Sequence, residues 1–406
     1  MKKLPFCVLL AAVTLAACSN PGIEYVDFDT FHVTKVTRGD VLMQDGSMNP
    51  EIVMPEGAHD LPQTKLASIG SQNLAKNLAG SFTSNSLIHI SGTYTGHDVD
   101  GSPLTLSGKL LVPENGKIKN LLIVSHYTIG ANLDCPTECF PLEGIVAAKG
   151  YAVILPDYIG FGVTRDRIHP YLHARSTARS VIDMALAVKP YLKHIGKEPE
   201  SDEVILVGYS QGGSITMSVM QMIQDEYSEE LPIKKVYAGG GCYDLNATYD
   251  DAVSSGKTGI PCAIPMLILG MNEGEGLNLD MADFFQPRLL ENYDEWINSK
   301  KYTLGQIDDL MGTEDLTELL TDAGRDKTNP NTAELYKAFF FNSTLHFVPA
   351  SPVYLFHTRN DNCVPFINAL HAQQAYTGCD VEYDFGDYGS HSNGAVTFIL
   401  KVTGML

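Results

Sequence analysis

A serine flanked by glycines, directly after a buried apolar run, constrains this chain more than any other feature. The run Val-Ile-Leu-Val at 204–207 leads into Gly-Tyr-Ser-Gln-Gly-Gly at 208–213, and an amphipathic stretch follows at 215–223. A strand that turns this tightly into a helix strains the serine backbone and leaves no space for a Cβ atom two residues to either side. We therefore expect Ser210 to present its hydroxyl above a sheet, beside a backbone N–H group and a helix N-terminus.

The strand, turn and helix around Ser210 are the context in which the motif Gly-x-Ser-x-Gly carries the nucleophile of an α/β-hydrolase. The bare motif is weak, because a chain with 36 glycines can contain it by accident. A glycine-rich turn without chemistry is the alternative, and the surrounding pattern favours the nucleophile.

The rest of the apolar pattern predicts a mostly parallel, doubly wound α/β sheet. Residues 85–112 alternate in polarity around the turn signal at 98–101, as an antiparallel hairpin does. Further along, the apolar runs become continuous, as in parallel strands that are buried on both faces. Strands alternate with helical stretches, in chain order at 121–124, 138–149, 151–155, 173–195 and 204–209.

A long insertion interrupts this core. The strand-like segments 235–239 and 352–357 are separated by about a hundred largely helical residues, where a short link would suffice. We interpret the excess as a cap that excludes water and shapes the substrate pocket. The predicted division is a signal peptide at 1–17, an N-terminal extension at 18–80, an α/β-hydrolase core at 81–245 and 349–406, and the cap at 246–348.

The first residues predict export. Met1-Lys2-Lys3 is basic, residues 4–17 are mostly apolar, and small residues precede Cys18. This pattern is typical of a bacterial lipoprotein signal that is cleaved before Cys18, whose thiol is then acylated. An ordinary secretion signal, with Cys18 incidental, is the alternative. We predict an exported lipoprotein anchored in the outer membrane, facing the periplasm or the cell surface.

The charge of the chain excludes two classes of partner. With 28 basic and 48 acidic residues the formal net charge is −20, and no cluster of lysine and arginine interrupts this acidity. Nucleic acid and bare anionic lipid surfaces would be repelled. We therefore expect membrane contact only through the N-terminal lipid, and a small-molecule, lipid or polysaccharide ester as the substrate.

Six cysteines would remain beside the acylated one in the mature protein. An oxidising compartment permits disulfides, so up to three are expected. We predict that neighbours in the sequence pair, namely Cys135 with Cys139, Cys242 with Cys262, and Cys363 with Cys379. A zinc site at the first pair would lack a second ligand pair nearby, so no metal is expected.

Ser210 needs a base, and in this fold the chain order is serine, acid, histidine. His391 lies in a small-residue loop at 389–394, after the strand-like residues 381–385. A loop beyond the last strand is where a base can reach the serine, so His391 is the expected base. Three other histidines follow Ser210, at a strand end, before a strand and on a helix: His357, His346 and His371.

Asp361 is the expected acid. It follows an apolar strand directly, at the carboxyl edge where open α/β sheets hold their sites. Asp384 and Asp387 are alternatives, nearer to the histidine in the sequence but on or after the final strand.

The oxyanion of the reaction requires two backbone N–H donors. One should be Gln211, which follows the nucleophile. The other should come from the loop at 125–130, where Tyr127 and Thr128 are equal candidates and where His126 is expected to hold the loop by hydrogen bonding.

With these residues identified, the chain resembles the secretory lipase family of α/β-hydrolases, which includes fungal secreted lipases and bacterial secreted esterases. The resemblance covers residues 85–400 and rests on Gly150-Tyr151, 156–162, 169–172, the helix with Ala178, Asp183 and Ala187, 208–213, 361–365 and His391. It implies carboxylic-ester hydrolysis by Ser210, Asp361 and His391, with no metal and no organic cofactor. Many hydrolases have His-Gly where this chain has His126-Tyr127, so the resemblance does not fix the oxyanion donors.

Two other functions fit the same residues. A serine peptidase of this fold would use the same three side chains, which do not distinguish an ester from an amide. A surface lipoprotein could instead bind glycans or lipids on a hydrolase scaffold without catalysis. The presence of serine, acid and histidine in the required order favours an enzyme that works through an acyl-enzyme.

Overall fold

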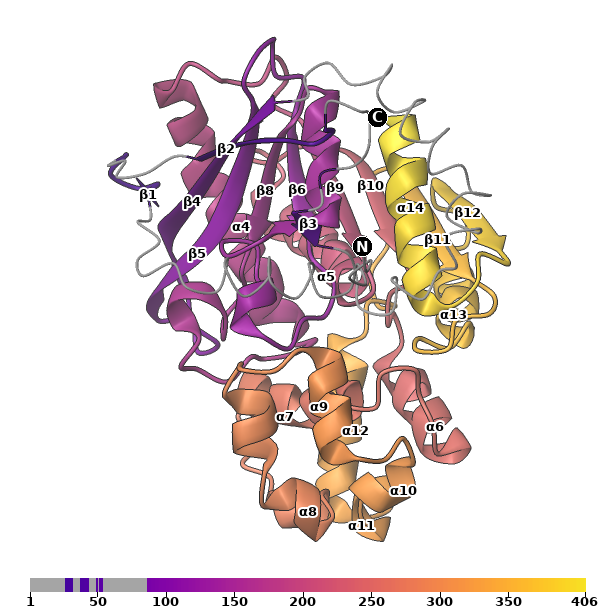
Figure 1. Ribbon diagram of the computed structural model, residues 1–406. Helices are drawn as coiled ribbons and strands as arrows, with labels where there is room; N and C mark the ends of the chain where they lie inside the picture. Colours follow the sequence, from indigo (N-terminus) through magenta and orange to yellow (C-terminus); the bar gives the residue numbers. More distant parts are fainter. Residues whose placement is uncertain (1–25, 32–36, 44–48, 50, 54–85) are drawn as a thin grey trace, which may run out of the picture.

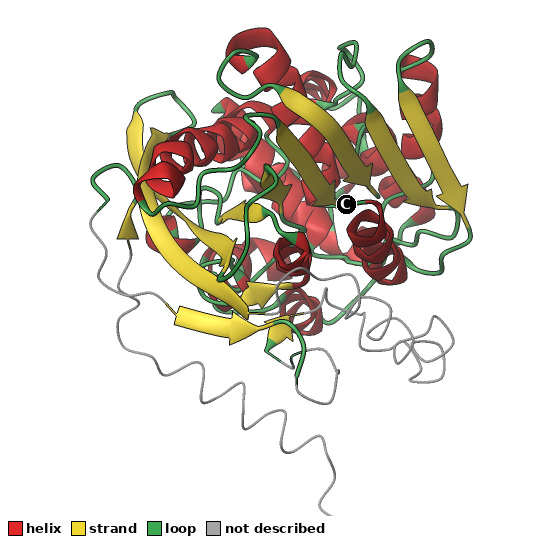
Figure 2. Cartoon of the chain, turned by 90° about the horizontal axis from the view of Figure 1, so that it is seen from above, coloured by secondary structure: helices red, strands yellow, loops and turns green. Residues whose placement is uncertain are grey.

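A twisted sheet with helices on both faces forms the body of the molecule (Figures 1 and 2). The computed structural model describes residues 26–31, 37–43, 49, 51–53 and 86–406. The predicted signal peptide, Cys18 and most of the predicted N-terminal extension lie outside the described residues.

The sheet follows the order β1-β4-β5-β8-β6-β9-β10-β11-β12, and β2 pairs with β4. From β8 to β12 every pair along this path is parallel, whereas β5 is antiparallel to both β4 and β8. The strands are β1 (Val26–Asp27), β2 (Thr37–Asp40), β4 (Ser86–His97), β5 (Pro103–Pro113), β6 (Leu121–Ser125), β8 (Ala152–Pro156), β9 (Val204–Tyr209), β10 (Ile233–Gly239), β11 (Val353–Thr358) and β12 (Val381–Gly386). The predicted hairpin and the predicted parallel, doubly wound sheet are both confirmed.

The sheet separates two apolar cores, because successive residues of a strand point to opposite faces. In β6, Leu121 and Ile123 pack into one core, whereas Leu122 and Val124 pack into the other. The first core is covered by α4 (Ala174–His194), α5 (Gln211–Met222) and α13 (Ile367–Ala375). The second is covered by α14 (His391–Met405) and the 3₁₀ helix η3 (Leu142–Lys149). Burial on both faces explains why the parallel strands are continuously apolar.

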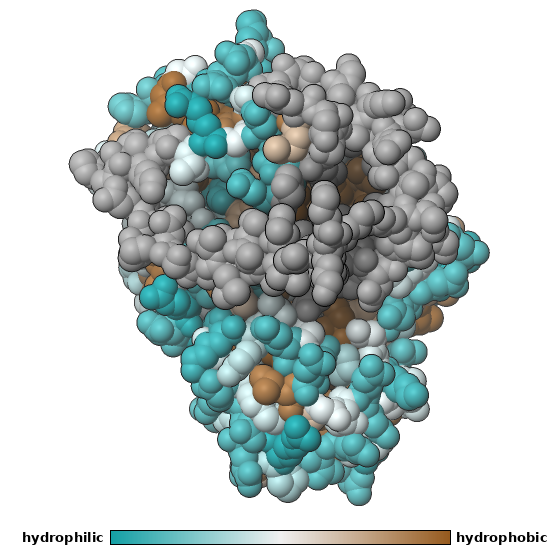
Figure 3. All heavy atoms as spheres, in the orientation of Figure 1, coloured by the Kyte–Doolittle hydropathy of each residue, from teal (hydrophilic) through white to brown (hydrophobic). Residues whose placement is uncertain are grey.

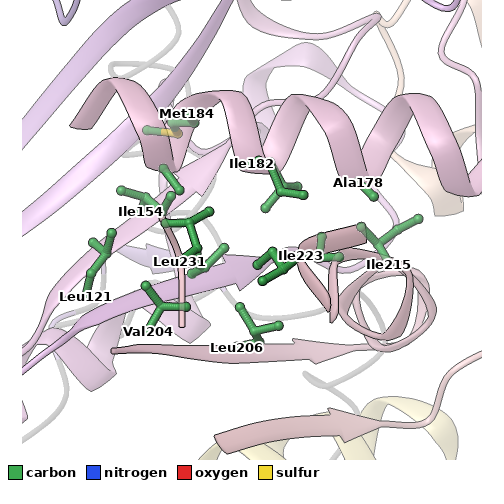
Figure 4. Close-up of a cluster of buried hydrophobic side chains, with 14 of the residues drawn as sticks. Leu121, Ile154, Ala178, Ile182, Met184, Val204, Leu206, Ile215, Ile223 and Leu231 are labelled. Atoms are coloured by element: carbon green, nitrogen blue, oxygen red, sulfur yellow. The ribbon is translucent and has the colours of Figure 1, made fainter. Parts of the chain in front are cut away.

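Figure 4 shows how the first core joins these layers. Ala178 and Ile182 of α4 lie above Leu206 of β9, with Ile215 of α5 beside them. All four side chains are almost completely buried. This packing fixes α5 against the sheet and with it the start of the helix, where Ser210 lies.

The prediction of a helix at 138–149 is wrong for the first half of this segment. Residues 140–141 form the short strand β7 (Phe140–Pro141), which pairs with β3 (Ile52–Val53) in a separate two-stranded sheet. Pro141 has no backbone N–H to donate within a helix, so the helical turns begin only after it. They form η3, and Gly150 ends it with a φ of 93°, a left-handed conformation that favours glycine.

The segment between β10 and β11 has a core of its own. Its helices are α6 (Leu245–Ser255), α7 (Ala263–Glu275), α8 (Pro287–Leu290), α9 (Leu304–Met311), α10 (Leu316–Leu319), α11 (Asp322–Arg325) and α12 (Pro330–Asn342). Their buried apolar side chains form a third cluster with few members from the sheet. In Figure 1 these helices gather below the sheet, where the chain enters them from the carboxyl end of β10.

The surface of this helical segment is mainly hydrophilic in the view of Figure 3, around one small apolar patch. Within the described part of the chain, no helix combines the length and the hydropathy needed to cross a bilayer.

The predicted disulfides are not formed, and all six cysteines are free. In the first pair, Cys135 Sγ contacts Thr137 Oγ1, whereas Cys139 Sγ donates to the carbonyl of Asp134. In the second pair, Cys262 Sγ donates to the carbonyl of Leu304 rather than facing Cys242.

The third predicted pair is excluded by topology. Cys363 follows the carboxyl end of β11, whereas Cys379 precedes the amino end of β12, and these strands are parallel. The two cysteines therefore lie at opposite edges of the sheet, separated by about 20 Å of strand, while a disulfide needs Cα atoms about 6 Å apart. Spacing in the sequence does not reveal which edge a residue occupies.

Candidate active site

Ser210 stands at a sharp turn between β9 and α5. Its φ is 60° and its ψ is −125°, a conformation that is strained for a residue with a side chain. The strand and the helix on either side keep the residue in this conformation. The Ser210 N–H also donates to the carbonyl of Gly239 at 2.9 Å. The side chain is 7 % exposed, which leaves the hydroxyl accessible only from the carboxyl edge of the sheet.

The glycines around Ser210 leave no room for larger residues, as the sequence predicted. A Cβ atom on Gly208 would lie 2.2 Å from the carbonyl oxygen of Gly212, and one on Gly212 would lie 2.0 Å from that of Ser125. The second contact is the more informative, because Ser125 ends β6 and begins the loop in which the second oxyanion donor is expected. The start of α5 and this loop therefore touch backbone to backbone.

His391 is brought to the serine from the far end of the chain. Its Nε2 lies 2.8 Å from Ser210 Oγ, and its Nδ1 lies 2.7 Å from Asp361 Oδ2. The residue is the first of α14 rather than part of a loop, because Ser390 caps the helix by accepting from the N–H of Asn393. The hydroxyl of Tyr209 donates to the carbonyl of His391 at 2.8 Å, which ties the histidine to the turn that holds the serine.

The side chain of Asp361 is fully buried, just beyond the carboxyl end of β11. Its Oδ1 accepts from the N–H groups of Cys363 and Val364 at 2.9 and 2.8 Å, which leaves Oδ2 for His391. Burial alone would raise the pKa of Asp361, but the attraction of His391 and their hydrogen bond outweigh it and hold the pKa below its usual value. The carboxylate is thus ionised at neutral pH.

The alternative histidines have other partners. His357 is completely buried, with Nε2 3.1 Å from the carbonyl of Val364 and 3.6 Å from Oδ2 of Asp361, and burial lowers its pKa, so it is neutral. His371 pairs with Asp244 at 2.7 Å. His346 is exposed and faces the carbonyl of Phe340. None of these three rings contacts Ser210 among the described residues.

The alternative acids do not reach the base either. Asp384 accepts hydrogen bonds from Lys401, Tyr354 and Tyr388. Asp387 makes no contact with His391 among the residues that the structure describes. Asp361 is therefore the carboxylate that the fold brings to His391.

The structure separates the two oxyanion candidates. The N–H of Tyr127 is directed at Oε1 of Glu143, 3.4 Å away. The N–H groups of Thr128 and Gln211 have no acceptor within the described part of the chain. These two N–H groups flank the contact between α5 and the loop after β6. They are therefore available to a ligand, whereas the N–H of Tyr127 is directed at Glu143.

Three buried side chains hold this loop. His126 Nδ1 donates to the carbonyl of Tyr127 at 2.7 Å, as expected, and burial lowers the pKa of His126 to about 4, so the ring is neutral. The hydroxyl of Tyr158 donates to the carbonyl of His126. The hydroxyl of Thr128 contacts that of Tyr171 at 2.8 Å.

Glu143 is a feature of the site that the sequence analysis missed. It lies on η3 and is 1 % exposed, and its Oε2 has no hydrogen-bond partner among the described residues. Burial raises the pKa of Glu143 to about 7. A glutamate inside the apolar stretch Pro-Leu-Glu-Gly-Ile-Val-Ala-Ala at 141–148 was the available signal.

His169 is a second residue of the site whose role the sequence did not indicate. Its Nε2 accepts from the side-chain amide of Gln211 at 2.9 Å, and its Nδ1 donates to the carbonyl of Ile159. Burial lowers the pKa of His169 to about 3, which keeps the ring neutral and able to accept. The residue after the nucleophile is thereby fixed through its side chain.

Comparison with known proteins identifies the family. The sequence matches the secretory lipase family over residues 140–397, which is more than half of the chain. The chain belongs to the secretory lipase family. It is therefore a carboxylic-ester hydrolase, and the family implies that it is exported. No match to a curated protein was found.

Solved structures share the α/β-hydrolase fold. The rice cell wall degrading esterase LipA from Xanthomonas oryzae is 24 % identical with a TM-score of 0.68, and a putative hydrolase from Legionella pneumophila is 21 % identical with a TM-score of 0.67. Both alignments cover 82 % of this chain and 92 % of the other. Candida antarctica lipase A is 16 % identical with a TM-score of 0.56, over 78 % of this chain and 75 % of its own.

We predict that Gly212→Ala destabilises the protein by at least about 2 kcal/mol and removes esterase activity, because the new methyl group forces α5 away from the end of β6. Urea denaturation and ester hydrolysis measure the two effects. The matched control is Gly404→Ala in α14, where a Cβ atom meets nothing within 4 Å. Gly404→Ala should leave the free energy of unfolding unchanged or raise it by up to about 1 kcal/mol. Equal stability of the two variants would contradict the prediction.

We predict that Glu143→Gln changes the dependence of stability on pH. The pKa of Glu143 is raised in the folded state to about 7 from 4.5, so the folded protein binds the proton more tightly and wild-type stability falls as the pH rises between these values. The glutamine variant lacks this loss. Its free energy of unfolding relative to that of the wild type should therefore rise by about 2–3 kcal/mol from pH 4 to pH 8. Urea unfolding at both pH values measures the difference.

The control for this prediction is Glu382→Gln, since the side chain of Glu382 is 65 % exposed. Its stability relative to wild type should not depend on pH over the same range. A Glu143→Gln variant that behaves like this control would show that Glu143 is ionised at no cost in the folded protein.

Proposed function

We propose that this protein hydrolyses carboxylic esters through an acyl-enzyme on Ser210, with His391 as general base and acid and Asp361 as the group that orients it. The hydrogen-bonded chain from Ser210 to His391 to Asp361, with contacts of 2.8 and 2.7 Å, carries the proposal. The three residues come from segments that are far apart in the sequence, namely the turn before α5, the segment after β11 and the first turn of α14, and apolar packing alone does not require them to meet.

The proposed reaction has two halves. His391 Nε2 takes the proton of Ser210 as Oγ attacks the ester carbonyl, and the resulting imidazolium protonates the leaving oxygen, so that the ester bond breaks and the alcohol departs. Water then gives a proton to His391 and attacks the acyl-enzyme, and the acid is released with return of the proton to Ser210. Asp361 remains ionised and stabilises the imidazolium.

We assign the oxyanion hole to the N–H groups of Gln211 and Thr128. Both lack an acceptor within the described residues, and both sit where α5 meets the loop after β6. Two fixed donors of this kind lower the barrier by about 3–4 kcal/mol each. His126 and Tyr158 keep the loop in place, and His169 keeps Gln211 in place.

The helical segment at 246–348 is proposed to act as a cap, with the core at 81–245 and 349–406. Two contacts with the loop after β6 support this proposal. The N–H of Asn132 donates to the carbonyl of Lys300 at 2.8 Å, and a Cβ atom on Gly130 would lie 2.7 Å from the carbonyl oxygen of Tyr302. A segment in this position excludes water from the reacting groups.

The remaining parts of the proposal concern location and substrate. We propose that residues 1–17 are a signal peptide, that 18–80 form an extension, and that acylated Cys18 anchors the enzyme in the outer membrane. LipA of Xanthomonas oryzae is described as a cell wall degrading esterase, which supports an ester borne on a polysaccharide as one substrate class. Family membership equally supports lipid esters.

We predict that Ser210→Ala lowers kcat for 4-nitrophenyl esters by about 10⁴-fold or more, because the nucleophile is lost while binding is retained. The variant should also lose labelling by a fluorophosphonate probe, read by mass spectrometry. The matched control is Ser218→Ala, in the same helix, whose buried hydroxyl donates only to the carbonyl of Ser214. It should keep both activity and labelling.

Three outcomes would count against the proposal. Labelling that persists in Ser210→Ala would place the nucleophile elsewhere. A wild-type protein that neither turns over esters nor takes the label would support a binding role without catalysis. Faster turnover of chromogenic peptides than of esters would make the protein a peptidase.

A further inference from the structure

Glu143 is a buried carboxyl group that the proposed reaction does not use. Among the described residues it forms no ion pair, and its Oε2 has no hydrogen-bond partner. The side chain lies inside the second core, on a helix whose other residues are mostly apolar. Burying a carboxyl group without a cation or a full set of hydrogen bonds is costly, so its presence here needs a physical reason.

The one contact of the carboxyl group is with the loop after β6. Oε1 accepts from the N–H of Tyr127 at 3.4 Å, and Tyr127 is the residue directly before Thr128. Adjacent amide nitrogens of a chain are less than about 4 Å apart, which puts the carboxyl group within about 8 Å of the Thr128 nitrogen. An oxyanion that accepts from this N–H at about 3 Å would therefore lie within about 11 Å of Glu143.

At this distance the protonation state of Glu143 affects the reaction. A carboxylate would repel the developing oxyanion and slow the reaction roughly ten-fold, at the effective dielectric constant of about 20 that is typical of proteins. A neutral carboxylic acid would not repel it, and its carbonyl oxygen would still accept from the N–H of Tyr127. The neutral form can thus hold the loop without opposing the charge that the reaction creates.

The surroundings of Glu143 do not favour its ionised form. η3 packs against β4, β5, β7, β8 and α14 as well as against the loop after β6. Burial lowers the pKa of His89 and of His126 to about 4, so both rings are neutral. Burial also raises the pKa of Cys139 to about 12 and the pKa of Tyr158 above its usual value, so neither group is charged at neutral pH.

The lysines of these elements have other partners. Nζ of Lys109, on β5, donates to a backbone carbonyl, and burial lowers the pKa of this lysine. On α14, Lys401 pairs with Asp384. Lys149 is the last residue of η3, whereas Glu143 is in its first turn.

We propose that Glu143 is a positioning residue of the oxyanion hole that works as a neutral carboxylic acid, so that its ionisation slows ester hydrolysis. This inference rests on the proposed function and adds both a residue and a pH dependence to it. Burial raises the pKa of Glu143 to about 7, so the acid form prevails below this pH and the carboxylate above it. His391, at the start of α14 and paired with Asp361, acts as a base only when it is neutral, and a mechanism limited by this base alone would keep its rate as the pH rises.

The test compares Glu143→Gln with the wild type on an uncharged ester, 4-nitrophenyl butyrate, from pH 5.5 to pH 9. Glutamine retains the shape and the acceptor oxygen but cannot ionise. The measured quantity is the ratio of kcat/KM of the variant to that of the wild type, in which the titration of His391 cancels. We expect a ratio near unity at pH 5.5 that rises to roughly ten-fold at pH 9, as the Coulomb repulsion implies, with a midpoint near 7.

The matched control is Glu382→Gln, whose side chain is 65 % exposed in the wild type. Its ratio should stay near unity at every pH. A Glu143→Gln ratio that is the same at every pH, whatever its value, would show that the side chain serves packing alone and would overturn the inference. Failure of the wild type to cleave the ester at any pH would instead overturn the proposed function.

A second measurement needs no variant, in case Glu143→Gln fails to fold. The wild-type kcat/KM should itself decline between pH 7.5 and pH 9.5, because Glu143 loses its proton while His391 remains neutral. Circular dichroism at each pH checks that the fold is intact. A wild-type rate that is level or rises over this range would overturn the inference.

Discussion

The backbone contact between Gly212 and Ser125 is the constraint on which the rest of the site depends. It brings the first turn of α5 against the end of β6, and no side chain larger than hydrogen fits between them. The same approach strains Ser210 and sets the N–H of Gln211 beside the loop that contains Thr128. One close packing contact between two elements thereby creates both the strained turn at Ser210, the proposed nucleophile, and the pair of N–H donors next to it that have no acceptor among the described residues.

Around this contact the protein controls charge by burial. His126 and His169 are kept neutral because they are removed from water, and each acts as a fixed hydrogen-bonding group. Asp361 is equally buried but remains ionised, because two backbone N–H groups and His391 face it. The neutral rings hold the groups of the proposed oxyanion hole, and the ionised carboxylate faces the proposed base. Similar burial therefore leaves the two histidines neutral and Asp361 ionised, because the groups that face these side chains differ.

Much of this could be predicted from the sequence, for a physical reason. The strands and the turn at Ser210 are encoded locally, by continuous apolar runs and by glycines where a Cβ atom would clash. Chain order then restricts the acid and the base to the loops after β11 and β12, and the structure brings Asp361 and His391 to Ser210.

The choice between Tyr127 and Thr128 depends on the direction of single N–H groups, which composition does not encode. Glu143 interrupts the apolar stretch at 141–148, but the sequence does not show that its carboxyl group is buried beside the loop after β6. The disulfide pairing was wrong because proximity along the chain does not show which edge of the sheet a residue occupies.

The place of His391 at the start of α14 ties the proposed base to the packing of this helix against the sheet. The histidine is the first residue of a helix that runs to Met405 and packs into the second core, and the hydroxyl of Tyr151 donates to the carbonyl of Leu406. Any fraying that spreads up this helix withdraws the imidazole from Ser210 while leaving the nucleophile turn intact. Loss of turnover on heating can thus precede loss of the sheet, so that thermal inactivation and global unfolding become separate events.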